Sequence, residues 1–101
     1  MIARIWRGRT PASKSDEYHE YLTKTGFQEI TATSGNRGVY ILRRLQGGEA
    51  EFLFLSLWES LEAIKRFAGN DYEKARYYPE DEKYLIELEP EVRLYEVLVG
   101  E

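Results

Sequence analysis

The segment EFLFLSLW, residues 51–58, carries most of the information about the fold, because both of its alternating faces are apolar. Its two phenylalanines, Phe52 and Phe54, point to one side of an extended strand, and the three leucines point to the other. A strand with one face in water alternates with polar residues. We therefore expect both faces of this strand to be covered.

A hairpin precedes this strand. Gly47 and Gly48 form a turn signal, and the segment 39–45, VYILRRL, is predicted to be the partner strand. The first four residues of that segment are apolar on both faces as well. Two neighbouring strands thus share the same unusual pattern.

A helix is predicted after the strand, beginning at Ser60 and ending at Gly69. Its apolar residues recur at helical spacing: Leu61, Ile64, Phe67 and Ala68. Asn70 and Glu73 have the spacing of a helix cap, which predicts a short further helix that ends before Pro79.

The amino-terminal part supplies a strand and a helix. Residues 2–9 are predicted to form the first strand. Thr10, or the capping pattern of Ser13 and Asp16, is expected to start a helix that Gly26 stops.

The order is completed by a helical turn within 82–88 and a last strand over 92–99. The resulting βαββαβ order predicts an α+β fold of ferredoxin-like topology, a four-stranded antiparallel sheet with both helices on one face. The other face would be bare and apolar, so we expect a homodimer in which two sheets pack face to face as a dimeric α+β barrel.

Composition limits the classes of function. The 101 residues are expected to form a single domain, 1–101, and the chain has no cysteine, which excludes thiol chemistry and cysteine metal sites. The net charge is −4, and residues 51–101 carry 13 acidic against 6 basic side chains, which disfavours nucleic-acid binding. No apolar run spans a membrane and no signal peptide is evident, so we expect no membrane partner and a cytoplasmic location.

The chain resembles a known family. Residues 57–64, LWESLEAI, with 67–71, FAGND, and then Ala75 and Pro79, resemble the antibiotic biosynthesis monooxygenase-like group of dimeric α+β barrels. Residues 92–97 resemble the last strand of that family. The resemblance covers nearly the whole chain and implies the fold described above.

The resemblance implies several activities. Some members oxidise polycyclic phenols or hydroquinones with O2 and without metal or flavin, and others degrade haem. The haem-degrading members ligate iron through a helical histidine and use an asparagine on the first strand. This chain has Arg76 and Tyr77 near the first position and RIW at residues 4–6, and its single histidine, His19, lies elsewhere. We therefore expect no haem, no metal and no other cofactor.

A cofactor-independent oxygenase needs an apolar slot for its substrate, a proton acceptor, and hydrogen-bond donors for an anionic oxygen. The candidate site residues are those that could meet these needs. The expected catalytic residues are Arg4, His19 and Arg76. The expected pocket is aromatic: Trp6, Tyr40, Phe54, Trp58, Phe67, Tyr77, Tyr78 and Tyr95. Each aromatic ring also suits a plain core, Arg4 also suits an ion pair with Glu96, and His19 also suits a surface position.

The run from Tyr77 to Asp81 is predicted to form a pocket lid or, alternatively, to pack simply on the sheet. The acidic residues 80–82 are expected to form a solvated turn and not a metal site.

The sequence favours a cofactor-independent monooxygenase that acts on a small phenol or quinol. One alternative is a non-catalytic or stress-related barrel that binds a small hydrophobic ligand. Another is a structural dimer with a filled core.

Overall fold

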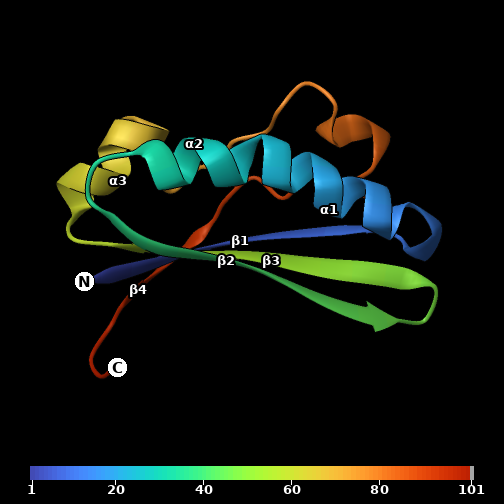
Figure 1. The fold of residues 1–101 in the computed structure, drawn as a ribbon, viewed down its shortest axis with the longest axis horizontal. Coiled ribbons are helices and arrows are strands. Elements are labelled where there is room, and N and C mark those ends of the chain that lie inside the picture. The colour runs from blue at the N-terminus through green and yellow to red at the C-terminus, as the bar shows by residue number, and fades with distance from the viewer. Residues whose placement is uncertain (101) are drawn as a thin grey trace.

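The computed structural model describes residues 1–100, which form one four-stranded antiparallel sheet with helices on one of its faces (Figure 1). The strands are β1 (Ile2–Pro11), β2 (Asn36–Gln46), β3 (Glu49–Trp58) and β4 (Arg93–Glu96), in the spatial order β2-β3-β1-β4. The helices are α1 (Ser15–Lys24), α2 (Gly26–Ala32) and α3 (Leu61–Ala68), with short 3-10 turns at Ala12–Lys14 and Asp81–Lys83. The predicted ferredoxin-like α+β fold is confirmed.

The hairpin and the third helix follow the local sequence signals. Gly47 and Gly48 have φ angles of +59° and +82°, which two-residue hairpin turns require and which only glycine adopts without strain. Helix α3 begins after Ser60, whose side chain accepts a hydrogen bond from the Ala63 backbone N–H, and ends before Gly69.

The first helix differs from the prediction at both ends. Strand β1 extends through Pro11 because Ala12 N donates to Gly48 O at 2.8 Å, and α1 therefore begins only at Ser15 with no side-chain cap. Gly26 does not stop the helical path but begins α2, after a bend at Thr25. A Cβ on Gly26 would lie 3.2 Å from the Phe54 ring, so the bend brings the backbone close to the sheet at this point.

The segment between α3 and β4 also differs. No helix forms from Asn70, because the backbone here bonds across to residues 90–92: Ala75 N donates to Pro90 O and Val92 N donates to Glu73 O. The last strand is limited to β4, which pairs with residues 2–5 of β1, and one further backbone hydrogen bond follows it, from Val97 N to Met1 O at 3.0 Å, where the chain begins.

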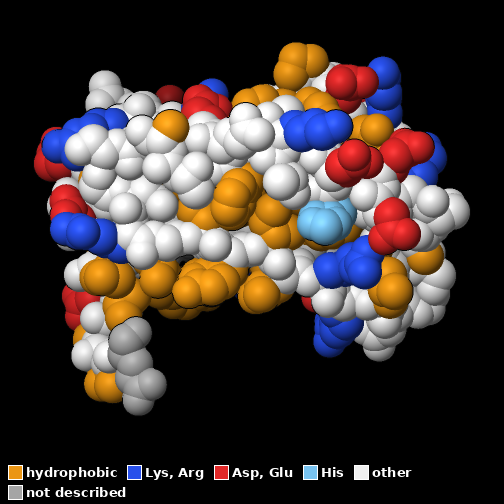
Figure 2. Space-filling view, viewed as in Figure 1, with side chains coloured by type: hydrophobic (Ala, Val, Ile, Leu, Met, Phe, Trp, Pro, Cys, Tyr) orange, Lys and Arg blue, Asp and Glu red, His pale blue; other side chains and the backbone are white. Residues whose placement is uncertain are grey.

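The register divides the side chains of the sheet between two faces. On the helix side, Trp6 lies opposite Phe54, and Phe52 and Trp58 on the same face are fully buried. On the other side, the bare face, Leu55 lies between Ile5 and Tyr40. Figure 2 shows hydrophobic side chains gathered along this lower side of the molecule. The two apolar faces of β3 are thus confirmed, and the helices cover one of them.

Candidate functional site

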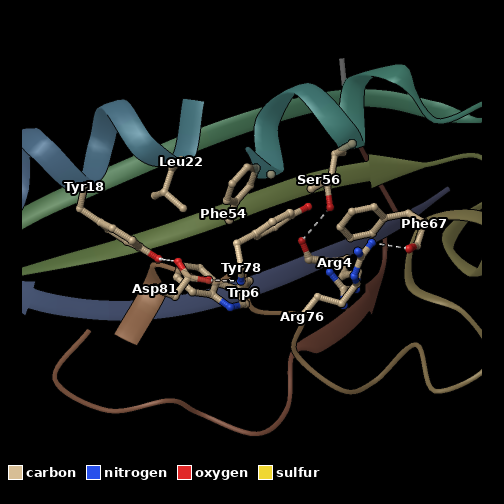
Figure 3. Close-up of a pocket in the computed structure, with 12 residues that line it drawn as sticks. Arg4, Trp6, Tyr18, Leu22, Phe54, Ser56, Phe67, Arg76, Tyr78 and Asp81 are labelled. Carbon is tan, nitrogen blue, oxygen red and sulfur yellow. Dashed lines mark hydrogen bonds between the residues drawn. The ribbon is translucent and has the colours of Figure 1, made fainter. Parts of the chain in front are cut away.

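A cavity lies between the helix side of the sheet, the bend between α1 and α2, and the segment after α3 (Figure 3). Its lining residues are Arg4, Trp6, Tyr18, Leu22, Gly26, Ile30, Phe54, Ser56, Phe67, Arg76, Tyr78 and Asp81. Strands β1 and β3 supply Arg4, Trp6, Phe54 and Ser56 from alternate positions on one face. The free space between these side chains is about 30 Å³, which admits water but no organic ligand.

Arg4 is the buried cation of this cavity, with 3% of its surface exposed. Its Nε donates to Tyr72 O at 3.3 Å and its Nη2 donates to Lys74 O at 3.1 Å. These partners are neutral carbonyls, so Arg4 has no carboxylate partner among the described residues. Burial, with a smaller contribution from Arg76, lowers the pKa of Arg4 to about 10. The expected ion pair with Glu96 does not form, because Arg4 and Glu96 lie in β1 and β4 at non-opposed positions.

Arg76 is the second cation at this site, and both guanidinium groups face the Phe67 ring. The distances from the guanidinium carbons to the ring centroid are 5.4 Å for Arg4 and 4.7 Å for Arg76. Arg76 Nη1 also donates to Phe67 O at 2.7 Å and to Glu29 Oε1 at 2.9 Å. Glu29 therefore pairs with Arg76, whereas Arg4 has no carboxylate partner among the described residues, which leaves an excess of positive charge around Phe67.

Tyr78 closes the cavity on the side of this ion pair. Its hydroxyl donates to the carboxylate of Glu29, and its backbone N–H donates to Asp81 Oδ2 at 2.5 Å. Burial, together with the hydrogen bond to Glu29, raises the pKa of the Tyr78 hydroxyl well above its usual range. Tyr78 is therefore a neutral phenol held at the mouth of the cavity by two acidic side chains.

Asp81 and Tyr18 form a buried polar pair at the other end of the cavity. Tyr18 donates its hydroxyl to Asp81 Oδ1 at 2.8 Å, and both residues are almost fully buried. Desolvation raises the pKa of the Asp81 carboxyl, opposed by the hydrogen bonds from Tyr78 and Tyr18. The prediction that residues 80–82 form a solvated turn is thus wrong for Asp81. Its buried carboxylate accepts hydrogen bonds from the backbone N–H of Tyr78 and from the hydroxyl of Tyr18.

Aromatic rings form the walls of the cavity. Trp6 packs edge to face against Phe54, with ring centroids 6.4 Å apart, and also against Tyr77. Among residues 1–100, the indole N–H of Trp6 is the buried side-chain polar atom that has no hydrogen-bond partner. A flat, apolar ligand would thus meet aromatic surface on several sides.

The structure brings six of the eleven predicted site residues together around this cavity: Arg4, Arg76, Trp6, Phe54, Phe67 and Tyr78. Trp58 and Tyr77 lie next to it. Trp58 stacks on Phe67 and donates its indole N–H to Ser56 Oγ at 2.9 Å, and the Tyr77 hydroxyl donates to Glu89 O.

Three predicted residues lie elsewhere. His19 lies on the outer surface of α1, beside Ile41 and Arg43 (Figure 2, pale blue), so it does not contact the cavity. Tyr40 and Tyr95 are 57% and 50% exposed on the bare face, because the register places them opposite Leu55 and Ala3.

Several residues that line or contact the cavity are not among those predicted from the sequence. Tyr18 and Leu22 are buried residues of α1, but their contact with the cavity depends on the bend at Thr25. No local sequence pattern identifies Glu29 as a site residue, because its partners Arg76 and Tyr78 lie 47 and 49 residues further along the chain.

The family model for antibiotic biosynthesis monooxygenases matches residues 1–76. The chain belongs to this family. No curated protein sequence matches the chain.

Solved structures with the same fold include other members of the antibiotic biosynthesis monooxygenase group. A candidate antibiotic biosynthesis monooxygenase from Bacillus cereus is 19% identical with a TM-score of 0.68, covering 99% of this chain and 93% of that one. The haem degrader MhuD from Mycobacterium tuberculosis, with two haems in its active site, is 20% identical with a TM-score of 0.65, covering 99% and 98%. At these identities the likeness establishes the fold.

The residues of this chain do not fit a haem. Histidine, the expected iron ligand, is absent from the cavity lining, since His19 lies on the outer surface. Residues 1–100 also contain no cluster of metal-binding side chains, and none of their helices has the length and hydropathy of a membrane-spanning segment.

Proposed function

We propose that the protein is an oxygen-dependent monooxygenase that acts on a small, electron-rich phenol in the aromatic cavity. Membership of the antibiotic biosynthesis monooxygenase family supports an activity of the monooxygenase type. The observation that carries the proposal is Arg4, a buried cation without a carboxylate partner, enclosed by Trp6, Phe54 and Phe67.

The proposed reaction is balanced without a further reactant. A phenol with a hydrogen on the carbon para to its hydroxyl reacts with O2 to give a para-quinone and water. One oxygen atom enters at the para carbon, the other leaves as water with the phenolic and the para hydrogen, and four electrons pass from the phenol to O2. An anthrone reacts in the same way to give an anthraquinone and water.

Arg4 would stabilise the phenolate oxygen that forms when the phenol gives up its proton, and the superoxide that forms when the phenolate passes its first electron to O2. A cation fixed in a water-poor cavity stabilises a negative oxygen more strongly than a cation in water does. The second cation, Arg76, adds to the same field at the Phe67 end of the cavity.

Oxygen uptake tests this proposal. Metal-free protein is assayed with anthrones, hydroquinones and catechols, beside Arg4→Met and the control Arg66→Met, whose side chain is exposed on α3 and donates to Ser34 O. We expect Arg4→Met to lower kcat/KM by about 100-fold to 1,000-fold, as the loss of an oxyanion donor does, and Arg66→Met to leave it unchanged. Equal rates in the two variants would contradict the role of Arg4.

We also propose that the bare face binds a second copy of the chain. Leu42, Tyr40 and Tyr95 are exposed there, and the central leucines of β3 are only half-buried. Apolar surface of this kind is unfavourable in water, and a two-fold axis covers it with a copy of itself.

Light scattering at micromolar concentration tests this assembly. The protein is expected to show the mass of two chains, and Leu55→Lys that of one chain. Leu45→Lys is a matched control, because Leu45 lies in the same hairpin but faces the helix side. A single-chain mass for the unmodified protein would refute the dimer.

A further inference from the structure

The closed cavity poses a question about how a substrate would enter. Its free space of about 30 Å³ is too small for any phenol, so a side chain has to leave before a ring can bind. Three lining residues, Arg76, Tyr78 and Asp81, come from the segment between α3 and β4, which has little regular structure, and Tyr78 is the one with an aromatic ring. Figure 3 shows its ring in the middle of the lining residues, between Phe54 and Arg4.

Tyr78 itself carries a phenol ring, as the proposed substrate does, but its para carbon bears the side-chain methylene and so lacks the hydrogen that the proposed reaction removes. Its ring lies 5.8 Å from the Arg76 guanidinium carbon, and its hydroxyl donates to Glu29. Glu29 is oriented in turn by Arg76, at 2.9 Å. The chain therefore already holds a phenol ring between aromatic walls, with a carboxylate as the acceptor of its hydroxyl.

We propose that Tyr78 occupies the position of the substrate ring in the closed protein, and that Glu29, oriented by Arg76, accepts the hydrogen bond of the substrate hydroxyl once Tyr78 moves out. This inference rests on the proposed function, because it assigns a partner to the hydroxyl of the same substrate. It adds Glu29, which is 41% exposed at its side chain, as a residue that determines specificity.

The surroundings of Tyr78 allow such a movement. A segment of more than 20 residues, 69–92, connects α3 to β4, and connections of this length frequently act as lids. Arg4 holds the start of that segment at Tyr72 and Lys74, and Asp81, two residues after Pro79, is held in the protein interior by the Tyr18 hydroxyl. Tyr78 lies between these two fixed points.

Neither fixed point depends on the Tyr78 side chain. Asp81 accepts hydrogen bonds from the backbone N–H of Tyr78 and from the hydroxyl of Tyr18, so the ring of Tyr78 is held by Glu29, by the Arg76 guanidinium and by packing. Gly26 adds room on the helix side, since a Cβ there would lie 3.7 Å from the Tyr78 ring. The ring can therefore leave by side-chain rotation with the backbone held.

The arrangement predicts selection for a hydroxyl. A carboxylate accepts a hydrogen bond from a phenol but receives none from a phenyl ether of similar size. Sites that bond a substrate hydroxyl discriminate against analogues that lack it. Because Glu29 is partly exposed, we expect the preference for phenol over anisole to be about tenfold and not larger.

Ligand binding to a variant that lacks the ring tests the inference directly. Calorimetric titration with phenol and with anisole is performed on the unmodified protein, on Tyr78→Ala and on the double variant Tyr78→Ala/Glu29→Gln. Tyr77→Ala is the matched control, because Tyr77 is the neighbouring tyrosine and does not line the cavity.

We expect Tyr78→Ala to bind phenol at least tenfold more tightly than the unmodified protein and Tyr77→Ala do. We expect Glu29→Gln in the Tyr78→Ala background to weaken phenol binding about tenfold and to leave anisole binding unchanged. The inference is overturned if Tyr78→Ala binds no phenol, or if phenol and anisole bind equally and Glu29→Gln changes neither. If near-UV circular dichroism shows that Tyr78→Ala is unfolded, Tyr78→Val is titrated under the same criteria.

The outcome is separate from that of the proposed function, because binding is measured without turnover. Phenol binding with this pattern, in a protein that takes up no oxygen, supports the role of Tyr78 and Glu29 and contradicts the monooxygenase. Oxygen uptake by the unmodified protein, with no phenol binding in Tyr78→Ala, supports the monooxygenase and contradicts the role of Tyr78 and Glu29.

Discussion

Replacing Arg4 by methionine should cost the protein little stability while removing the positive charge of the cavity. Arg4 is 3% exposed and donates two hydrogen bonds to the carbonyls of Tyr72 and Lys74. Hydrogen bonds from charged groups contribute about 1.5–3 kcal/mol each, so their loss would cost about 3–6 kcal/mol. Methionine fills much of the same apolar volume.

The charge itself offsets most of that cost. Burial lowers the pKa of Arg4 from its usual range to about 10, and this shift corresponds to a penalty of about 3 kcal/mol. Because the unfolded chain binds this proton more tightly, the penalty is fully present below pH 10 and is relieved only as the pH rises above that value. Arg4→Met removes the penalty.

The two contributions leave a net loss between about 0 and about 3 kcal/mol. Urea unfolding, followed through the fluorescence of Trp6 and Trp58, measures it at pH 7. A loss above about 4 kcal/mol would refute this reasoning, and it would show that Arg4 is retained to hold the segment at residues 72–74.

Two further changes have defined effects on stability. Tyr18→Phe leaves one oxygen of the buried Asp81 carboxylate without a donor and should cost about 1–3 kcal/mol in urea unfolding. Burial raises the pKa of Asp81, so the ionisation of Asp81 destabilises the folded state as the pH rises through that pKa. The cost of Tyr18→Phe should therefore be larger at pH 7 than at pH 3. An equal cost at both pH values would contradict this assignment. Ser60→Ala removes the cap of α3 and should lower stability by about 1 kcal/mol, whereas Ser60→Gly should lower it by only a few tenths.

The parts of the fold that the sequence predicts well are those with local signals. The hairpin at Gly47 and Gly48 and the boundaries of α3 at Ser60 and Gly69 depend on the conformational preferences of single residues. The bend at Thr25 depends instead on a distant ring in β3, and a helix signal at Gly26 alone cannot reveal it.

The site was predictable where it rests on strand alternation. Alternation places Arg4 and Trp6 on one face of β1, and both line the cavity. The face of Tyr40 and Tyr95 depends on the register between strands, which the sequence does not specify, and both were expected on the wrong side of the sheet. Asp81 was misjudged because its charge suggests exposure, whereas its hydrogen bonds come from residues that only the fold brings near.

The most direct test of the central claim follows the fate of the oxygen atoms. The purified protein oxidises an anthrone under ¹⁸O₂, and the quinone is reduced and trapped before its oxygens exchange with water. A monooxygenase acting in this cavity predicts one ¹⁸O atom in each product molecule, with a yield that falls in Arg4→Met and not in Arg66→Met. Product without ¹⁸O, or a yield of labelled product that is the same in both variants, would contradict the account.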